Sequence, residues 1–168
     1  MLHVHHLWGS IRYYYFNYVH PHPTDFSADE VFPRLWVGDL TAAFDLPGLQ
    51  RHHITHVVNV VPGIPTLHEP LHYLNIPCLD AEDYNMSAHF ANTNAFITDA
   101  LKDPSHNVLV HCSVGRSRSV TVAMAYHLSV SDDSVKDTLM SIQHKRPMAQ
   151  PNDGFMKQLH AFHTCGAK

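Results

Sequence analysis

The sequence carries little charge and no long apolar segment. Of its 168 residues only 15% are charged, and the net charge is −4 at neutral pH. No block of Lys and Arg is present to neutralise nucleic-acid phosphates. No apolar run reaches the about 18 residues that a membrane-spanning helix requires. We therefore expect a protein that binds neither nucleic acid nor a membrane.

Cysteine is also scarce, whereas histidine is abundant. The three cysteines, Cys78, Cys112 and Cys165, are too few and too scattered for a disulfide framework. The opening residues lack the apolar core of a secretory signal, so we expect a reducing, cytoplasmic or nuclear location. The 17 histidines accompany no Cys-x-x-Cys or His-Glu-x-x-His pattern. We interpret them as a feature of composition, with a structural metal site as the alternative.

The length is that of one domain with a real hydrophobic core. Residues 1–28 form an aromatic extension, rich in tyrosine around position 14 and then broken by prolines. We expect this extension to pack on the domain, and a docking segment for a partner is the alternative. The domain itself is predicted to span residues 29–165.

Strand and helix patterns alternate along this domain. A mostly parallel sheet of about five strands, with helices on both faces, is the architecture that such alternation favours. The strand at 107–111 is almost wholly apolar, which is typical of a central strand. The predicted strands are 35–38, 55–61, 73–76 and 107–111, and the predicted helices are 87–102 capped by Ser87, 115–128, one from Ser131 or Asp132 to Pro147, and one from Pro151.

The stretch from Val108 to Ser119 has the features of an anion cradle. A buried strand leads into Cys112, small residues, Arg118 and a helix. Small residues let the loop curl so that its N–H groups point inward, and the N-terminus of the helix adds partial positive charge. Arg118 can bind two phosphate oxygens. The same field favours a thiolate, so the pattern predicts phosphoryl transfer to sulfur.

The alternative role of Cys112 is that of a buried structural thiol in a tight turn. However, Arg116 and Arg118 flank Ser117. Two guanidinium groups on one tight turn repel each other unless an anion joins them. The pattern therefore favours an anion site.

Residues 111–119, His-Cys-Ser-Val-Gly-Arg-Ser-Arg-Ser, resemble the His-Cys-x-x-Gly-x-x-Arg-Ser/Thr signature of the cysteine-dependent protein tyrosine phosphatases. The Ser-Arg-Ser ending is similar to that of the dual-specificity phosphatases, and the small size resembles their atypical, single-domain members. The resemblance implies that 29–165 is a catalytic domain. It extends to residues 32–38, 45–60, 85–90 and 151–155.

The resemblance also implies a role for each residue of the motif. Cys112 would be the nucleophile that forms a cysteinyl-phosphate, Ser119 would donate to the departing thiolate, and His111 would orient the loop and help keep Cys112 ionised. The backbone N–H groups and the arginine would hold the phosphate, with no metal or cofactor required. These phosphate-binding residues are Ser113, Val114, Gly115, Arg116, Ser117 and Arg118.

A general acid must protonate the departing oxygen. Asp80, Glu82 and Asp83 crowd one loop, and the resemblance implies Asp80, with Asp83 in reserve. Without such a role, Glu82 and Asp83 would form a solvated loop face. Arg116 is expected to face outward, either as a plain surface residue or to attract acidic substrates.

Cys78 closely precedes Asp80, at the end of a strand predicted to adjoin the catalytic one. It is interpreted as a small hydrophobic residue. The alternative is a thiol that traps oxidised Cys112 as a disulfide.

The expected substrate is a phosphoprotein. No counterpart of the phosphotyrosine-recognition loop is found, so the pocket should admit phosphoserine and phosphothreonine as well as phosphotyrosine. The same chemistry on an RNA 5′-triphosphate, a phosphoinositide or a glucan is the second hypothesis, although residues 113–117 contain no lysine. A catalytically weak phospho-binding module is the third, although Cys112, Arg118 and Asp80 are all present.

Overall fold

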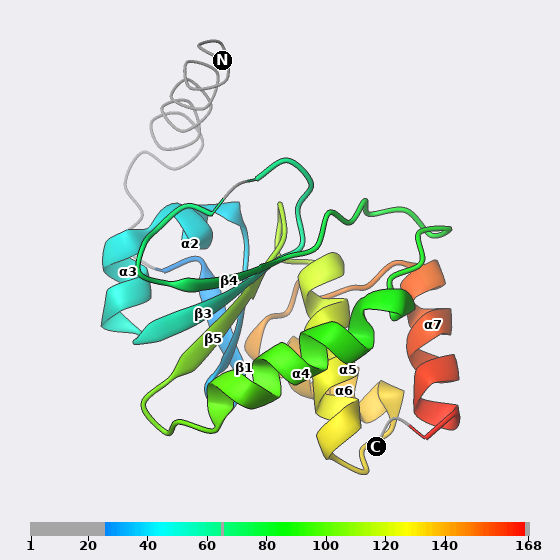
Figure 1. Ribbon diagram of the computed structural model, residues 1–168. Coiled ribbons are helices and arrows are strands. Elements are labelled where there is room, and N and C mark those ends of the chain that lie inside the picture. Colours follow the sequence, from blue (N-terminus) through cyan, green and yellow to red (C-terminus); the bar gives the residue numbers. More distant parts are fainter. Residues whose placement is uncertain (1–25, 65, 167–168) are drawn as a thin grey trace.

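The computed structural model describes residues 26–64 and 66–166, and these form one twisted sheet between two layers of helices (Figure 1). The sheet has five strands in the order β1-β2-β5-β3-β4. Only β1 is antiparallel to its neighbour, so the predicted mostly parallel α/β sheet is confirmed. The strands are β1 (Ala28–Phe32), β2 (Leu35–Gly38), β3 (Ile54–Asn59), β4 (His72–Asn75) and β5 (Asn107–His111).

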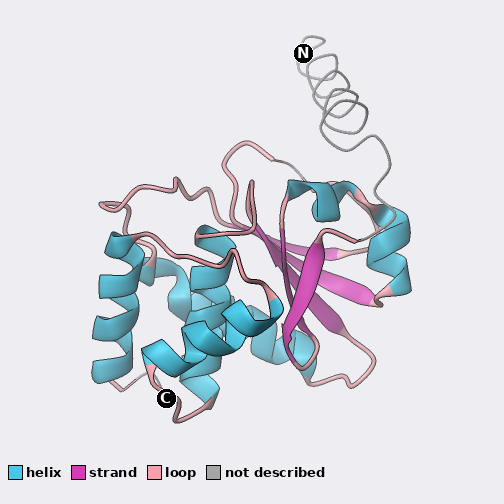
Figure 2. Cartoon of the chain, turned by 180° about the vertical axis from the view of Figure 1, so that it is seen from behind, coloured by secondary structure: helices cyan, strands magenta, loops and turns pink. Residues whose placement is uncertain are grey.

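Helices cover both faces of the sheet, as Figure 2 shows from behind. The short helices α2 (Leu40–Phe44) and α3 (Leu46–Arg51) pack against β5, β2 and β3 on one face. The longer helices occupy the other face. They are α4 (Phe90–Leu101), α5 (Arg118–Val130), α6 (Val135–Lys145) and α7 (Asp153–Thr164). No helix in the described part of the chain has the length and apolar character to cross a membrane.

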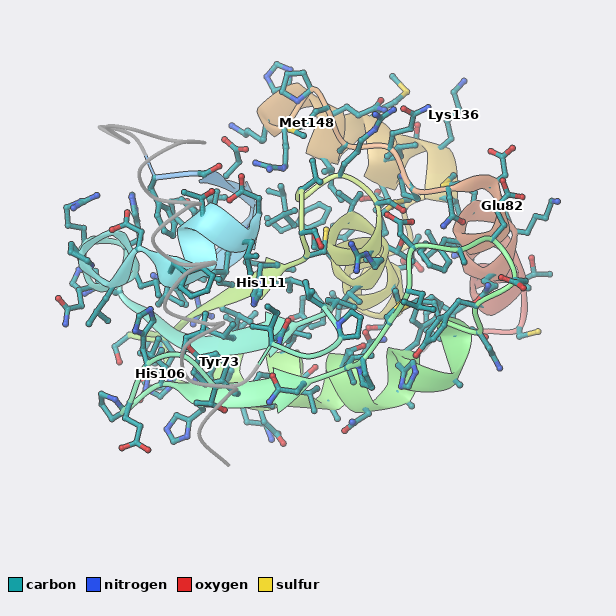
Figure 3. The ribbon with its side chains drawn as sticks, turned by 90° about the horizontal axis from the view of Figure 1, so that it is seen from above. Tyr73, Glu82, His106, His111, Lys136 and Met148 are labelled. Atoms are coloured by element: carbon teal, nitrogen blue, oxygen red, sulfur yellow. The ribbon has the colours of Figure 1, made fainter. Side chains whose placement is uncertain are left out.

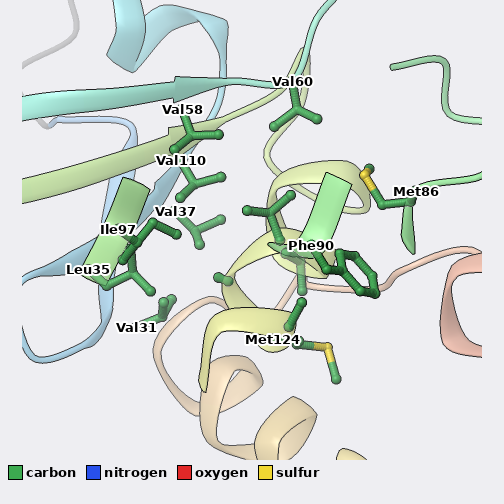
Figure 4. Close-up of a cluster of buried hydrophobic side chains, with 14 of the residues drawn as sticks. Val31, Leu35, Val37, Val58, Val60, Met86, Phe90, Ile97, Val110 and Met124 are labelled. Atoms are coloured by element: carbon green, nitrogen blue, oxygen red, sulfur yellow. The ribbon is translucent and has the colours of Figure 1, made fainter. Parts of the chain in front are cut away.

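The central position of β5 explains its apolar sequence. Successive side chains of a strand point to opposite faces. Val108 and Val110 therefore belong to the large core beneath α4 and α5, whereas Leu109 packs with Ala42 and Leu49 under α2 and α3. All three side chains are fully buried. Figure 4 shows Val110 within the larger core, beside Val37 and Val58 of the neighbouring strands.

The helix predicted over 87–102 begins differently from the expectation. Residues Ser87–His89 form a 3-10 turn, η2, before α4 starts at Phe90. Ser87 does not act as the cap, because its hydroxyl donates to Asn85 Oδ1 at 2.8 Å. The same Asn85 oxygen accepts from the N–H of Ala88 at 3.3 Å. The side chain that satisfies the first turn is therefore Asn85, just upstream of the predicted cap.

Two further helix starts are later than predicted. The helix α5 begins at Arg118 and not near Gly115, because residues 112–117 form the loop that precedes it. The helix α6 begins after Ser134, whose hydroxyl accepts from the N–H of Asp137 at 3.1 Å. Ser131, one of the two predicted starts of that helix, instead ends α5. The proposed packing of residues 1–25 lies outside the described residues.

Candidate active site

The loop between β5 and α5 is anchored to the end of β2. The N–H of Cys112 donates to Gly38 O at 3.3 Å, and the N–H of Leu40 donates to Ser113 O at 3.4 Å. Parallel strands bring their carboxyl ends to one edge of the sheet, where ligands of α/β proteins bind. The predicted phosphate-binding residues are therefore gathered at the expected edge.

Gly115 gives this loop its shape. Its φ is 69°, a left-handed conformation that side chains other than glycine rarely adopt. A Cβ at this position would lie 2.7 Å from the backbone oxygen of Gly38. The buried Arg146 fixes the loop from the other side, because its Nε donates to Gly115 O at 2.6 Å and its Nη1 pairs with Asp29 at 2.6 Å.

The Cys112 sulfur lies at the base of the loop, with 1% of the residue exposed. It accepts a hydrogen bond from the Ser119 hydroxyl at 3.3 Å and one from the N–H of Gly115 at 3.2 Å. Burial by itself raises the pKa of the thiol. Hydrogen bonds from Ser119 and from the backbone N–H of Val114, together with the charge of Arg118, outweigh that effect and lower the pKa of Cys112 below its ordinary value.

Arg118 reaches the same place from the first turn of α5, with 8% of its surface exposed. Its Nη1 donates to the carbonyl oxygens of Val60 and Cys78 at 3.3 and 3.1 Å. Its Nη2 donates to the Ser113 hydroxyl at 3.0 Å. The guanidinium is thus fixed in place by three neutral acceptors, and its charged neighbour is the Asp80 carboxylate, 3.7 Å from Nε.

Asp80 lies in the segment that follows β4, and its side chain contacts the loop between β5 and α5. Its Oδ1 accepts from the Ser117 hydroxyl at 2.7 Å and from Asn152 Nδ2 at 2.9 Å. Its Oδ2 lies 3.7 Å from Arg118 Nε, and 38% of its side chain is exposed. The carboxyl group therefore adjoins both solvent and the arginine of the loop.

The other carboxylate residues near Asp80 are exposed to solvent. They are Glu82, Asp83 and Asp153. A hollow of about 390 Å³ opens beside Asp80, and it is lined by Asp80, Glu82, Arg116, Ser117, Gln150, Pro151, Asn152 and Asp153. Arg116 is exposed and its guanidinium contacts the Gln150 side chain, so its predicted outward direction agrees with the structure.

Cys78 differs from Cys112 despite their proximity to the same arginine. Burial raises the pKa of the Cys78 thiol to about 12, and its Sγ donates to Leu79 O at 3.1 Å. The strand before it, β4, is at the edge of the sheet and pairs with β3. The prediction that this strand adjoins β5 is therefore wrong, because β3 lies between them.

His111 ends β5 and is completely buried. Burial lowers the pKa of its imidazole to about 4. The ring is therefore neutral at physiological pH. Any help that His111 gives to the ionisation of Cys112 therefore does not come from a positive charge.

Two residues of the site were not predicted from the sequence. Arg146 precedes a proline at the end of α6, and nothing near it in the chain indicates its contacts with Val114, Gly115 and Asp29. Asn152 carries a local signal for a helix cap, and it is the cap of α7. Its contact with Asp80 is not visible in that signal.

The histidines form no metal site in the part of the chain that is described. His56 forms ring contacts with His72 and His106, at centroid distances of 4.8 and 5.1 Å. No group of three or more His, Cys, Asp or Glu residues within 26–64 and 66–166 is arranged to hold a metal ion.

Comparison with known proteins gives one consistent family. Residues 35–165 match the family described as "Dual specificity phosphatase, catalytic domain". Human dual specificity protein phosphatase 22 is 34% identical over 134 residues, which cover 80% of this chain and 72% of that protein. A Slingshot homolog of Xenopus laevis is 37% identical over 134 residues, 79% of this chain and 19% of that protein. The chain spans 64% of the dual specificity protein phosphatase 22 of Xenopus tropicalis.

Solved structures agree with these matches. The crystal structure of DUSP15 has a TM-score of 0.82 and 33% identity, covering 86% of this chain and 92% of that chain. The structure of human DUSP28 has a TM-score of 0.78 and 30% identity, covering 85% and 97%. These likenesses extend over nearly all of the sheet and helices described above.

Proposed function

Because this chain belongs to the dual specificity phosphatase catalytic domain family, we propose that it hydrolyses phosphotyrosine, phosphoserine and phosphothreonine in proteins through a phosphate bound to Cys112. The observation that carries the proposal is the environment of the Cys112 sulfur. It accepts hydrogen bonds from Ser119 and Gly115, and its pKa is lowered although it is buried. A lowered pKa increases the share of thiolate, which is the nucleophilic form of cysteine.

In the first step the Cys112 thiolate attacks the phosphorus atom, and the P–O bond to the substrate side chain breaks. The proton on Asp80 passes to the departing oxygen, so that the leaving group is a neutral hydroxyl. The loop N–H groups and Arg118 stabilise the charge on the other phosphate oxygens. Because this charge is supplied by the protein, the step proceeds without a metal ion.

In the second step water attacks the phosphorus and the S–P bond breaks. Asp80, now ionised, accepts a proton from the water, and inorganic phosphate is released. The Ser119 hydroxyl stabilises the thiolate as it departs, because it already donates to the sulfur at 3.3 Å. The enzyme returns to its starting state with Asp80 protonated and Cys112 ionised.

The exposure of the rim supports a phosphoprotein substrate. Val114, two residues after Cys112, and Leu79, next to Asp80, are 55% and 59% exposed. A phosphate ester on a protein surface can approach such a rim without entering a deep cleft. The net charge of −4 and the absence of lysine from residues 113–117 disfavour RNA ends and anionic lipids. We also propose that the protein acts in the reducing environment of the cytoplasm or nucleus.

The test is the initial rate on a matched panel of substrates. The panel contains phosphotyrosine, phosphothreonine and phosphoserine peptides, a phosphoinositide and an RNA 5′-triphosphate. Cys112→Ser should abolish turnover of the peptides, whereas Cys165→Ser, at the exposed cysteine, should leave it unchanged. A chelator should leave the rates unchanged.

Three other results would change the proposal. Turnover of only the lipid or the RNA would keep the chemistry and replace the substrate class. Binding of phosphopeptides without turnover would indicate a binding module. Wild-type turnover by Cys112→Ser would place the nucleophile elsewhere.

A further inference from the structure

We infer that the start of α7 is the dock of the general-acid segment, residues 80–87, and that Asn152 is a positioning residue that aims the Asp80 carboxyl group. The inference deepens the proposed function and rests on it, because it concerns the residue proposed as the acid. It is carried by contacts between two segments that are far apart in the sequence. Asp80 and Asn152 are separated by 72 positions.

Asn152 joins three parts of the site. Its Nδ2 donates to Asp80 Oδ1 at 2.9 Å, and its own Oδ1 accepts from the N–H of Phe155 at 2.8 Å, which caps α7. Its backbone N–H donates to the Ser117 hydroxyl at 3.2 Å. That hydroxyl in turn donates to the same Asp80 oxygen at 2.7 Å. The cap therefore holds the amide of Asn152 in the one orientation in which its N–H group reaches Asp80.

The next turns of α7 contact the rest of the acid segment. A Cβ on Gly154 would overlap the backbone of Glu82, so the absence of a side chain lets this loop rest directly on the helix. Figure 3 shows Glu82 beside α7. One turn later, the side chain of Gln158 accepts from the N–H of Ser87 at 2.8 Å and donates to Tyr84 O at 2.9 Å. Both ends of the segment are thus fixed to one helix.

These contacts give the two carboxylate oxygens of Asp80 different surroundings. Two donors occupy Oδ1, whereas Oδ2 has the Arg118 Nε at 3.7 Å as its neighbour. A proton on Oδ1 would have to displace one of the donors. The transferable proton is therefore assigned to Oδ2, the oxygen that faces Arg118. Asn152 acts through Asp80 and does not itself touch the substrate.

The cap of α7 must be kept when this role is tested. Asn152→Ser retains an oxygen for the N–H of Phe155 but removes the amide donor to Asp80. Asn152→Asp also retains the cap and replaces the donor with a second carboxylate beside Asp80. Ser134→Ala, which removes the cap of α6, is a control for the stability effect of a cap. Circular dichroism and thermal melting would show which variants are folded.

The informative readout is the dependence on the leaving group. Asn152→Ser should lower kcat/KM for phosphoserine and phosphothreonine peptides about tenfold, the usual effect of one lost hydrogen bond. It should have a much smaller effect on an aryl phosphate whose leaving group needs no proton. Ser134→Ala should change both substrates equally or not at all. Combining Asp80→Asn with Asn152→Ser should add no further loss on the peptides.

The pH profile provides the second readout. In Asn152→Asp, repulsion between two carboxylates should keep the proton on Asp80 to higher pH, so the basic limb of kcat/KM should shift upward by about one pH unit. The other charged or titratable groups around Asp80 are unchanged in both variants. They are Cys78 and Glu82 from its own segment, Cys112, Arg116 and Arg118 from the loop and α5, and Asp153 from α7.

Two outcomes would overturn the inference and leave the proposed function intact. Wild-type rates on both substrate types in folded Asn152→Ser and Asn152→Asp, with an unshifted basic limb, would make Asn152 a cap alone. Equal losses on both substrate types would show a general distortion of the site. Failure of the proposed function is distinct, because it would appear in the wild-type protein as turnover that survives Cys112→Ser.

Discussion

The Ser119 hydroxyl donates to the Cys112 sulfur at 3.3 Å, in a place where Ser119 is completely buried and Cys112 is 1% exposed. A buried sulfur has few neighbours that can stabilise its negative charge. The loss of this hydroxyl should therefore affect the thiolate both in the resting enzyme and as a leaving group in the second step.

Ser119→Ala should raise the pKa of Cys112 by about one to two units, since a hydrogen bond to a charged group contributes roughly 1.5–3 kcal/mol. The rate of alkylation by iodoacetamide as a function of pH measures this change. Cys165→Ser should be present in both proteins, because Cys165 is exposed. Cys78 should not react, since its pKa is raised to about 12. Unchanged alkylation kinetics would show that the hydroxyl is not needed for the thiolate.

Asp80→Asn should reduce turnover of phosphopeptides by about 10²–10⁴-fold, the contribution of a positioned general acid. The loss on an aryl phosphate with a good leaving group should be much smaller. Asp83→Asn is the matched control, because Asp83 is an exposed carboxylate of the same loop. If Asp83→Asn showed the selective loss and Asp80→Asn did not, the reserve residue would be the acid.

Gly115→Ala should destabilise the fold by about 3 kcal/mol, since it combines a strained backbone with a steric clash. Gly63→Ala isolates the first effect, because Gly63 has a φ of 74° and no atom within 4 Å of the place that an added methyl group would occupy. That control should lose only about 1 kcal/mol. Urea unfolding of both variants measures the difference. Equal losses would show that the contact with Gly38 O is accommodated.

The buried His111 should make the fold less stable in mild acid. Its pKa is about 4 in the folded protein and 6.5 in its ordinary state. The unfolded chain therefore binds a proton on His111 as the pH falls below about 6.5, and the folded protein does not. The resulting loss of stability should develop between these two values and approach about 3 kcal/mol.

His111→Gln removes this titration, so its stability should fall less steeply with pH than that of the wild type. If the variant does not fold, the ring protons of His111 in the wild-type NMR spectrum give the same information. They should keep the chemical shifts of a neutral imidazole down to about pH 5. Titration near its ordinary value would contradict the prediction.

Much of this architecture could be predicted from short stretches of the sequence. The apolar run at 107–111 indicated a central strand, and the small residues after Cys112 indicated a loop before a helix. Both signals depend on neighbouring residues, so they are readable along the chain. Helix starts were less accurate, because Asn85 and Ser87, or Ser131 and Ser134, are all suitable capping residues. The choice between them depends on where the adjoining segments pack.

Tertiary structure alone brought Asp80, Asn152 and Arg146 to the loop. None of these is close to Cys112 in the sequence, and a short carboxylate, a helix cap and an arginine before a proline have many possible partners. The sequence by itself was enough to predict Cys112 as the nucleophile and the loop after it as an anion site, because a backbone that curls around one point needs its small residues in one continuous stretch. The orientation of the Asp80 carboxyl group was decided by the packing of α7 against residues 80–87, since hydrogen bonds between distant segments form only once the core has placed both.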